Sequence, residues 1–192
     1  MSTYQELKGL KIKYLSADTS GDRIQEGELF YNSTDFNLKS FVSVAAWHSV
    51  GSLIEGRTTE QGATGTATAG LVCFGNNGSP PYTTNATEEY DGNGWSAGGN
   101  TTHAASNGTA AGTQTAAIAV GMSDSPTTLT IKYDGTSWTD SGHAFPSTGG
   151  RGVGSGTQTA TLYSGQGSGT NSFEYDGSSW TAGGTMNTSR VG

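Results

Sequence analysis

The chain has 192 residues, a formal net charge of -7 and a glycine-rich, polar composition in which 13% of residues are charged. The acidic balance argues against binding to a nucleic-acid backbone, and no stretch approaches the ~18 apolar residues of a membrane-spanning helix. A single cysteine, Cys73, excludes an intrachain disulfide, and the N-terminus lacks the continuous apolar segment of a secretory signal. These features predict a soluble protein that is made in a cytoplasm.

Residues 1–60 differ from the rest of the chain, because they hold six of its nine lysines and arginines. Residues 29–35 followed by 38–41 indicate a β-hairpin with an Asn-Ser-Thr-Asp turn. Upstream, the pattern of Tyr4 to Leu15 fits either a short amphipathic helix or a strand that begins at Lys11, and both interpretations stay open. We predict that residues 1–60 form a small N-terminal region.

The remainder of the chain is built on a period of about 43 residues. A Tyr-Asp-Gly triplet followed by a tryptophan occurs three times, and the triplets start 43 and 42 residues apart. Trp47 marks an earlier, degenerate copy. A fixed period of this length indicates a repeat protein. The repeated residues are Tyr90, Asp91, Trp95, Tyr133, Asp134, Trp138, Tyr175, Asp176 and Trp180.

Each period carries several strand signals. The sequence Gly-Thr-Gln-Thr-Ala at 112–116 recurs at 156–160, and residues 113–120 alternate and then become apolar, which predicts one strand. Residues 128–133 and 137–139 predict two more strands around an Asp-Gly turn. Three to four short strands per period match one blade of a β-propeller. We predict an all-β fold with propeller-type repeats over residues 61–192, in which the repeated Tyr, Asp and Trp are structural.

The spacing also predicts an incomplete last repeat. The gap from a tryptophan to the next Gly-Thr is 17 or 18 residues, so a further Gly-Thr is expected near position 198, beyond Gly192. Two and a half blades cannot close a propeller. Either further repeats follow or several chains share one assembly.

These motifs resemble the kelch repeat, with an apolar strand ending in Gly, a Tyr, a Trp and a terminal Arg at Arg57 and Arg190. They resemble more closely the kelch-like repeat proteins of tailed bacteriophages of marine bacteria. The shared units are residues 29–34, 112–116, 133–139, 156–160 and 175–181. The resemblance implies a virion appendage such as a tail fibre, with an N-terminal attachment region docked on the particle and repeats that project outward.

The sequence offers little chemistry for catalysis. Its three histidines lie at non-equivalent positions, its single cysteine lies in an apolar run, and no residues have the spacing of a metal site. We predict that the protein is not an enzyme and uses no cofactor or metal. Loops 76–87 and 123–127 vary between repeats, as binding loops on a fixed scaffold do. Asn76, Asn77 and Tyr82 are the candidates for contact with a ligand such as a glycan.

The resemblance, with the lack of catalytic groups, implies a structural virion protein whose repeats are expected to adhere to a host-surface glycan. Its expected partners are other virion proteins, which the N-terminal region binds, and further copies of the chain in a homotrimer. Neither nucleic acid nor membrane insertion is expected. One alternative is a bacterial carbohydrate-binding or carbohydrate-modifying propeller, and another, within the virion, is a capsid decoration protein.

Overall fold

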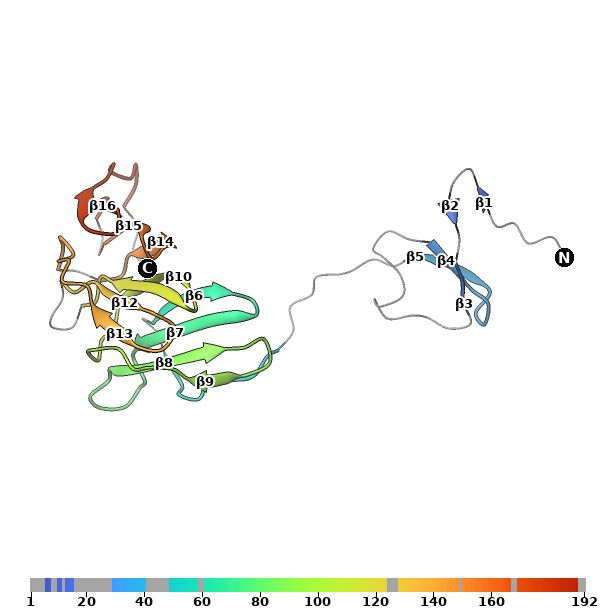
Figure 1. Cartoon of the computed structure of the whole chain (residues 1–192), viewed down its shortest axis with the longest axis horizontal. Coiled ribbons are helices and arrows are strands. Elements are labelled where there is room, and N and C mark those ends of the chain that lie inside the picture. Colours follow the sequence, from blue (N-terminus) through green and yellow to red (C-terminus); the bar gives the residue numbers. More distant parts are fainter. Residues whose placement is uncertain are drawn as a thin grey trace. The chain divides into compact units, whose positions relative to one another are not determined.

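The computed structural model describes residues 6–7, 10–11, 13–15, 29–40, 49–58, 61–123, 128–148, 150–166 and 169–189. The chain divides into two compact units, residues 1–49 and 50–192 (Figure 1). All assigned elements of the described residues are strands, so the prediction of an all-β fold is confirmed. Residues 50–58 belong to the second unit, whereas composition placed the division near residue 60.

The N-terminal unit contains a two-stranded ribbon and a three-stranded sheet. In the sheet, the central strand pairs in parallel with the strand before it and antiparallel with the strand after it. The segment left open between helix and strand is extended wherever it is described. The strands are β1 (Glu6–Leu7) and β2 (Leu10–Lys11) in the ribbon, and β3 (Lys13–Leu15), β4 (Leu29–Asn32) and β5 (Asn37–Ser40) in the sheet.

The predicted hairpin over residues 29–40 is present, and its turn explains the Asn-Ser-Thr-Asp sequence. The side-chain oxygen of Asn32 accepts hydrogen bonds from the backbone N–H groups of Thr34 and Asp35 at 2.9 and 3.1 Å. Asparagine is common at such positions because its side chain can replace a backbone acceptor in a turn. The predicted degenerate copy around Trp47 lies outside the described residues.

The C-terminal unit contains three four-stranded antiparallel sheets, each formed by strands that follow one another in the chain. We call them the first, second and third repeat sheets. The first comprises β6 (Gly62–Thr66), β7 (Ala69–Gly75), β8 (Thr84–Tyr90) and β9 (Trp95–Ala97). The second comprises β10 (Thr109–Thr113), β11 (Ala116–Val120), β12 (Ile131–Tyr133) and β13 (Trp138–Asp140). The third comprises β14 (Val153–Thr157), β15 (Ala160–Ser164), β16 (Ser172–Tyr175) and β17 (Trp180–Ala182).

The third sheet has all four strands, although the spacing predicted a truncated last repeat. The structural unit starts at the Gly-Thr strand and ends at the tryptophan strand. The segments that follow β9 and β13 lead to the next sheet and contain no assigned strand among the described residues. The Asp-Gly turns lie between the third and fourth strands, as predicted, at residues 91–94, 134–137 and 176–179.

One predicted strand is wrong, because residues 113–120 form the end of β10, a turn and β11. Gly112 has a φ of 110°, and a Cβ there would lie 2.2 Å from the carbonyl oxygen of Ala116. Only glycine adopts this conformation without strain. The Thr113 hydroxyl accepts a hydrogen bond from the Ala116 N–H at 3.1 Å, which closes the turn. Gly-Thr-Gln-Thr is therefore a hairpin sequence.

The first strands of the three sheets lie side by side in the C-terminal unit (Figure 1). The Thr64 hydroxyl of β6 donates to the Gly112 carbonyl of β10 at 2.8 Å. The Gly154 N–H of β14 donates to the Thr109 hydroxyl of β10 at 3.0 Å. Short polar side chains and glycines allow this close approach of neighbouring sheets, which accounts for the Gly- and Thr-rich composition of these strands.

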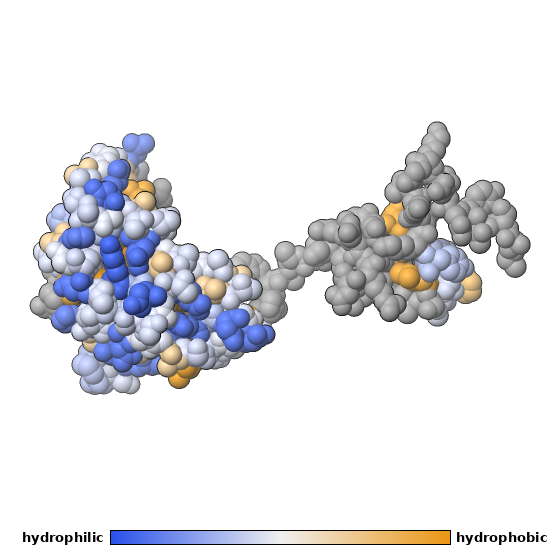
Figure 2. Space-filling model, in the orientation of Figure 1, coloured by the Kyte–Doolittle hydropathy of each residue, from blue (hydrophilic) through white to orange (hydrophobic). Residues whose placement is uncertain are grey.

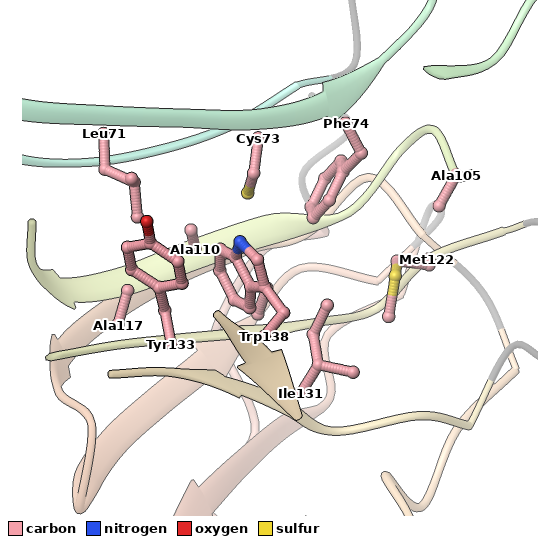
Figure 3. Packing of buried hydrophobic residues seen from close by; sticks show 11 residues of the cluster. Leu71, Cys73, Phe74, Ala105, Ala110, Ala117, Met122, Ile131, Tyr133 and Trp138 are labelled. Atoms are coloured by element: carbon pink, nitrogen blue, oxygen red, sulfur yellow. The ribbon is translucent and has the colours of Figure 1, made fainter. Parts of the chain in front are cut away.

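The hydrophobic core lies between the sheets and has two clusters. The cluster between the first and second sheets brings residues of β7, among them Leu71 and Cys73, against residues of β12 and β13 (Figure 3). Burial raises the pKa of the Cys73 thiol above its ordinary value, so the thiol stays protonated. The second cluster fills the space between the second and third sheets with Ala111, Ile118, Val120, Phe145, Tyr163 and Tyr175.

The surface of the C-terminal unit is mainly polar in the view of Figure 2, with small and scattered apolar areas. None of the described residues lies in a helix of the length and apolarity that crossing a bilayer requires.

Candidate functional site

In each of the three Tyr-Asp-Gly turns, the aspartate side chain accepts hydrogen bonds from backbone N–H groups. The Asp134 carboxylate accepts hydrogen bonds from the N–H groups of Thr136 and Ser137 at 2.9 and 2.8 Å. Asp91 and Asp176 bind the equivalent N–H groups of their own turns. These backbone hydrogen bonds hold the pKa of all three carboxyls below the ordinary value. The repeated aspartates thus fix the turn.

The lowered pKa of these carboxyls predicts that their contribution to thermal stability decreases in acid. A carboxyl with a lowered folded-state pKa stabilises the fold at pH values above its unfolded pKa of about 3.9, and the contribution is lost as pH falls. Asp134→Asn keeps an acceptor oxygen but does not titrate. We expect the difference in Tm between wild type and variant to shrink between pH 5 and pH 2. Thermal unfolding followed by circular dichroism measures it, and a pH-independent difference would contradict the assignment.

The repeated tyrosine and tryptophan of each turn stack on each other, and those of the second and third sheets also reach the preceding sheet. Ring centroids of Tyr133 and Trp138 are 5.0 Å apart, and the other two pairs are similar. The Trp138 indole N–H donates to the Thr87 hydroxyl at 2.9 Å, and the Trp180 indole N–H donates to the Thr130 hydroxyl at 2.9 Å. Both threonines lie three residues before the repeated tyrosine of the preceding sheet. The tryptophans therefore join consecutive sheets.

The tyrosine hydroxyl of the second sheet makes a further contact with the first sheet. Tyr133 donates to the Glu89 carboxylate at 2.5 Å and accepts a hydrogen bond from the Gly99 N–H at 3.4 Å. Burial, with the Glu89 hydrogen bond as the next contribution, raises the pKa of Tyr133 to about 12. The hydroxyl is thus a neutral donor over the physiological range, as a structural role requires.

The glutamine of the Gly-Thr-Gln-Thr hairpin makes a contact between sheets that the sequence did not predict. Gln114 donates through Nε2 to the carbonyl oxygens of Gly70 and Tyr90 in the first sheet, at 3.0 and 2.8 Å. Gln158 donates in the same way to Ala117 and Tyr133 in the second sheet, at 3.0 and 2.6 Å. The identical pentapeptides at 112–116 and 156–160 were the available signal. In the first sheet Ala67 occupies this position.

Removing this contact should weaken the junction between sheets. Gln158→Ala leaves two carbonyl groups without their donor, and each hydrogen bond contributes about 0.5–1.5 kcal/mol. We expect a loss of about 1–3 kcal/mol in the free energy of unfolding by urea. Thr159→Ala, one residue along the same turn, is the matched control and should change stability by less than about 0.5 kcal/mol. Equal losses in the two variants would refute the role of the glutamine.

The candidate ligand-binding residues lie in the loop between β7 and β8, at the opposite end of the strands from the repeated turns. The amide of Asn77 donates to the Glu55 carboxylate at 3.0 Å, and its oxygen accepts from the Ser79 N–H at 3.2 Å. The Asn76 side chain accepts from the Gly78 N–H at 2.8 Å. Both amides thus have partners within the loop and its neighbours. Residues 124–127 of the second candidate loop lie outside the described residues.

Tyr82 differs from the two asparagines because its side chain is 55% exposed. Its φ of 68° is unusual for a residue with a side chain, and its N–H donates to the Ser79 carbonyl at 2.6 Å. The loop therefore holds an aromatic ring out toward solvent on a fixed backbone. Of the three candidates, Tyr82 has the surface that a ligand could contact.

A buried ion pair joins the segment before β6 to strand β8 of the first repeat sheet. The Arg57 guanidinium and the Glu88 carboxylate are 3.0 Å apart, with side chains 0% and 3% exposed. The Glu88 carboxylate also accepts hydrogen bonds from the backbone N–H groups of Ile54 and Glu55, and the Arg57 guanidinium donates one to the Phe74 carbonyl. The pair fixes the segment before β6 on the first sheet. Its partners are those of a structural contact.

The described residues contain no group of three or more His, Cys, Asp or Glu side chains that could hold a metal ion. His103 contacts Thr102, and His143 lies 2.6 Å from the Tyr175 hydroxyl. The repeated residues lie in turns and between sheets and do not converge on one pocket. No protein-family model and no curated protein matches the chain.

Proposed function

We propose that this protein is a structural component of a tailed bacteriophage particle, a tail fibre or similar appendage. Residues 1–49 attach it to other virion proteins, and the repeat sheets project outward. One observation carries the proposal: the most regular side chains of the sequence form turns and join sheets. Gln114, Gln158, Trp138 and Trp180 all bind the preceding sheet. This use of the repeated side chains supports a structural role.

We propose further that the repeat sheets are arranged as kelch-like propeller blades. Three features support this arrangement: four consecutive antiparallel strands in each sheet, first strands that lie side by side, and aromatic residues that fill the space between sheets. Blades of a propeller share these features because each sheet buries its two faces against its neighbours.

Adhesion to a host-surface glycan is the activity proposed for the loop edge. Aromatic rings stack on sugar faces, and Tyr82 presents an exposed ring on a fixed loop. The neighbouring asparagine amides hold that loop in place. Tyr82→Ala should therefore reduce binding to host cells without reducing thermal stability. If the protein is a virion appendage, as proposed, Tyr82 contributes to adhesion and not to assembly of the particle.

The experiment that tests the virion role is cryo-electron microscopy of particles from the source culture, together with mass spectrometry of the purified particles. Density at the tail that fits the chain, in stoichiometric amount, supports an appendage and gives its oligomeric state, for which we propose a trimer. Density on the shell would instead indicate a capsid decoration protein. Absence from particles, with sugar binding by the isolated protein, would favour a bacterial carbohydrate-binding propeller.

A further inference from the structure

The outward face of the third repeat sheet exposes an apolar position that the other two sheets bury. Leu71, Ile118 and Leu162 are equivalent, because each pairs with the residue immediately before the repeated tyrosine of its sheet. Leu71 and Ile118 are 1% exposed, since the next sheet covers them. Leu162 is 46% exposed. The third sheet thus has an apolar side chain at a position that the next sheet buries elsewhere, but no described residue buries it here.

This face of the third sheet also has the polar groups that, in the first two sheets, bind side chains of the next sheet. Gln114 binds the carbonyl groups of Gly70 and Tyr90, and Gln158 binds those of Ala117 and Tyr133. By strand register, the equivalent carbonyl groups in the third sheet belong to Thr161 and Tyr175. In the described part of the chain no side chain donates to either.

The hydroxyl that receives a tryptophan is also present. Thr87 and Thr130 accept the indole N–H of the following sheet, and Ser172 occupies the equivalent position, three residues before Tyr175. Ser172 is 7% exposed, and its hydroxyl donates to the Gly184 carbonyl, so its lone pairs can still accept a hydrogen bond. An apolar side chain, two carbonyl groups and a hydroxyl therefore recur in the same arrangement.

We infer that this face, formed by β15 and β16, binds one further sheet of the same repeat, one that carries a hairpin glutamine and a tryptophan. The hairpin glutamine of this further sheet binds the Thr161 and Tyr175 carbonyl groups, its tryptophan binds Ser172, and its small and apolar side chains cover Leu162. The inference rests on the two junctions within the chain and is independent of the proposed virion role.

A second copy of this chain is a poor occupant for two reasons. Its first sheet has Ala67 at the glutamine position, so the contact with two carbonyl groups is missing. In addition, residues 54–57 already lie on that sheet, bound through Glu88. Phe145 of the segment between the second and third sheets packs on Phe173, which is equivalent to Glu88. Each junction therefore has room for one connecting segment. A second copy would bring two, its own residues 54–57 and the residues that follow β17 of the first copy.

The test uses a full chain with Leu162→Cys, in which the native Cys73 is buried and serves as the unreactive reference. Residues 141–182 are repeated directly after Ala182, so that the added sheet brings its own glutamine and tryptophan to the face. The expected result is a slowing of thiol labelling at position 162 by at least about tenfold relative to the chain without the insertion, because labelling then requires local opening.

The matched control changes Gln158→Ala and Trp180→Phe in the added copy only, and it should restore much of the labelling rate. A second insertion, residues 98–140 at the same place, guards against failure of the first added sheet to fold. Unchanged labelling in both insertion variants would overturn the inference. Concentration-dependent dimers of the chain without insertion, with position 162 protected, would overturn the inference in favour of a second copy as the occupant.

Discussion

Replacing Trp138 with alanine is expected to lower the free energy of unfolding by about 3–5 kcal/mol. The indole is 5% exposed and packs in the cluster between the first two sheets, opposite Leu71 and Cys73 (Figure 3). Its N–H also donates to the Thr87 hydroxyl. The variant therefore creates a cavity and leaves a buried hydroxyl without its donor. Urea unfolding monitored by circular dichroism measures the loss.

Two further variants separate the contributions. Trp138→Phe keeps most of the ring but removes the N–H donor, and it should cost about 1–3 kcal/mol. Trp95→Ala changes the same repeat position in the first sheet, where the indole is half-buried and its N–H has no acceptor among the described residues. It should cost clearly less than Trp138→Ala. If the two alanine variants lose equal stability, the tryptophan does not act by joining sheets.

Removal of the Glu88 carboxylate should be of similar size. Glu88→Ala leaves the Arg57 guanidinium buried without its ion pair, and breaking such a pair from one side costs about 3–5 kcal/mol. It also removes the acceptor for the backbone N–H groups of Ile54 and Glu55. We expect the segment before β6 to leave the first sheet. Hydrogen exchange of residues 54–57 should rise along with the loss of global stability.

A double variant tests whether the pair itself is needed. The positions equivalent to Glu88 hold Ile131 and Phe173, both apolar, so this place in the repeat accepts a hydrophobic side chain. Among the described residues, none is a hydrogen-bond partner for the buried Nε of Arg57, which adds to the cost of burying the pair. Arg57→Leu with Glu88→Ile should therefore recover much of the stability that Glu88→Ala loses. A double variant as unstable as the single one would show that the charges fix the segment.

Local patterns in the sequence predicted a large part of this structure. The Asp-Gly turns at Asp91, Asp134 and Asp176 form where they were expected, because the carboxylate and the glycine act within four residues of each other. The hairpin at residues 29–40 was predictable for the same reason. The all-β fold and the repeat period follow from aromatic residues at fixed spacing. The turns and the hairpin depend on near neighbours in the chain, and the period is visible in the sequence itself, so the sequence alone determined these features.

The contacts between sheets were decided only by the tertiary structure. Gln114 looks like an ordinary polar residue in a predicted strand, yet it lies in a turn and binds carbonyl groups of residues 44 and 24 positions earlier. Glu88 looks like an exposed strand residue, yet it is buried with Arg57, 31 positions away. Such partners meet only after one sheet packs on another. Spacing and composition therefore indicated the strands and Asp-Gly turns of each repeat but not the Gly-Thr-Gln-Thr turn, and packing decided which polar side chains join the sheets.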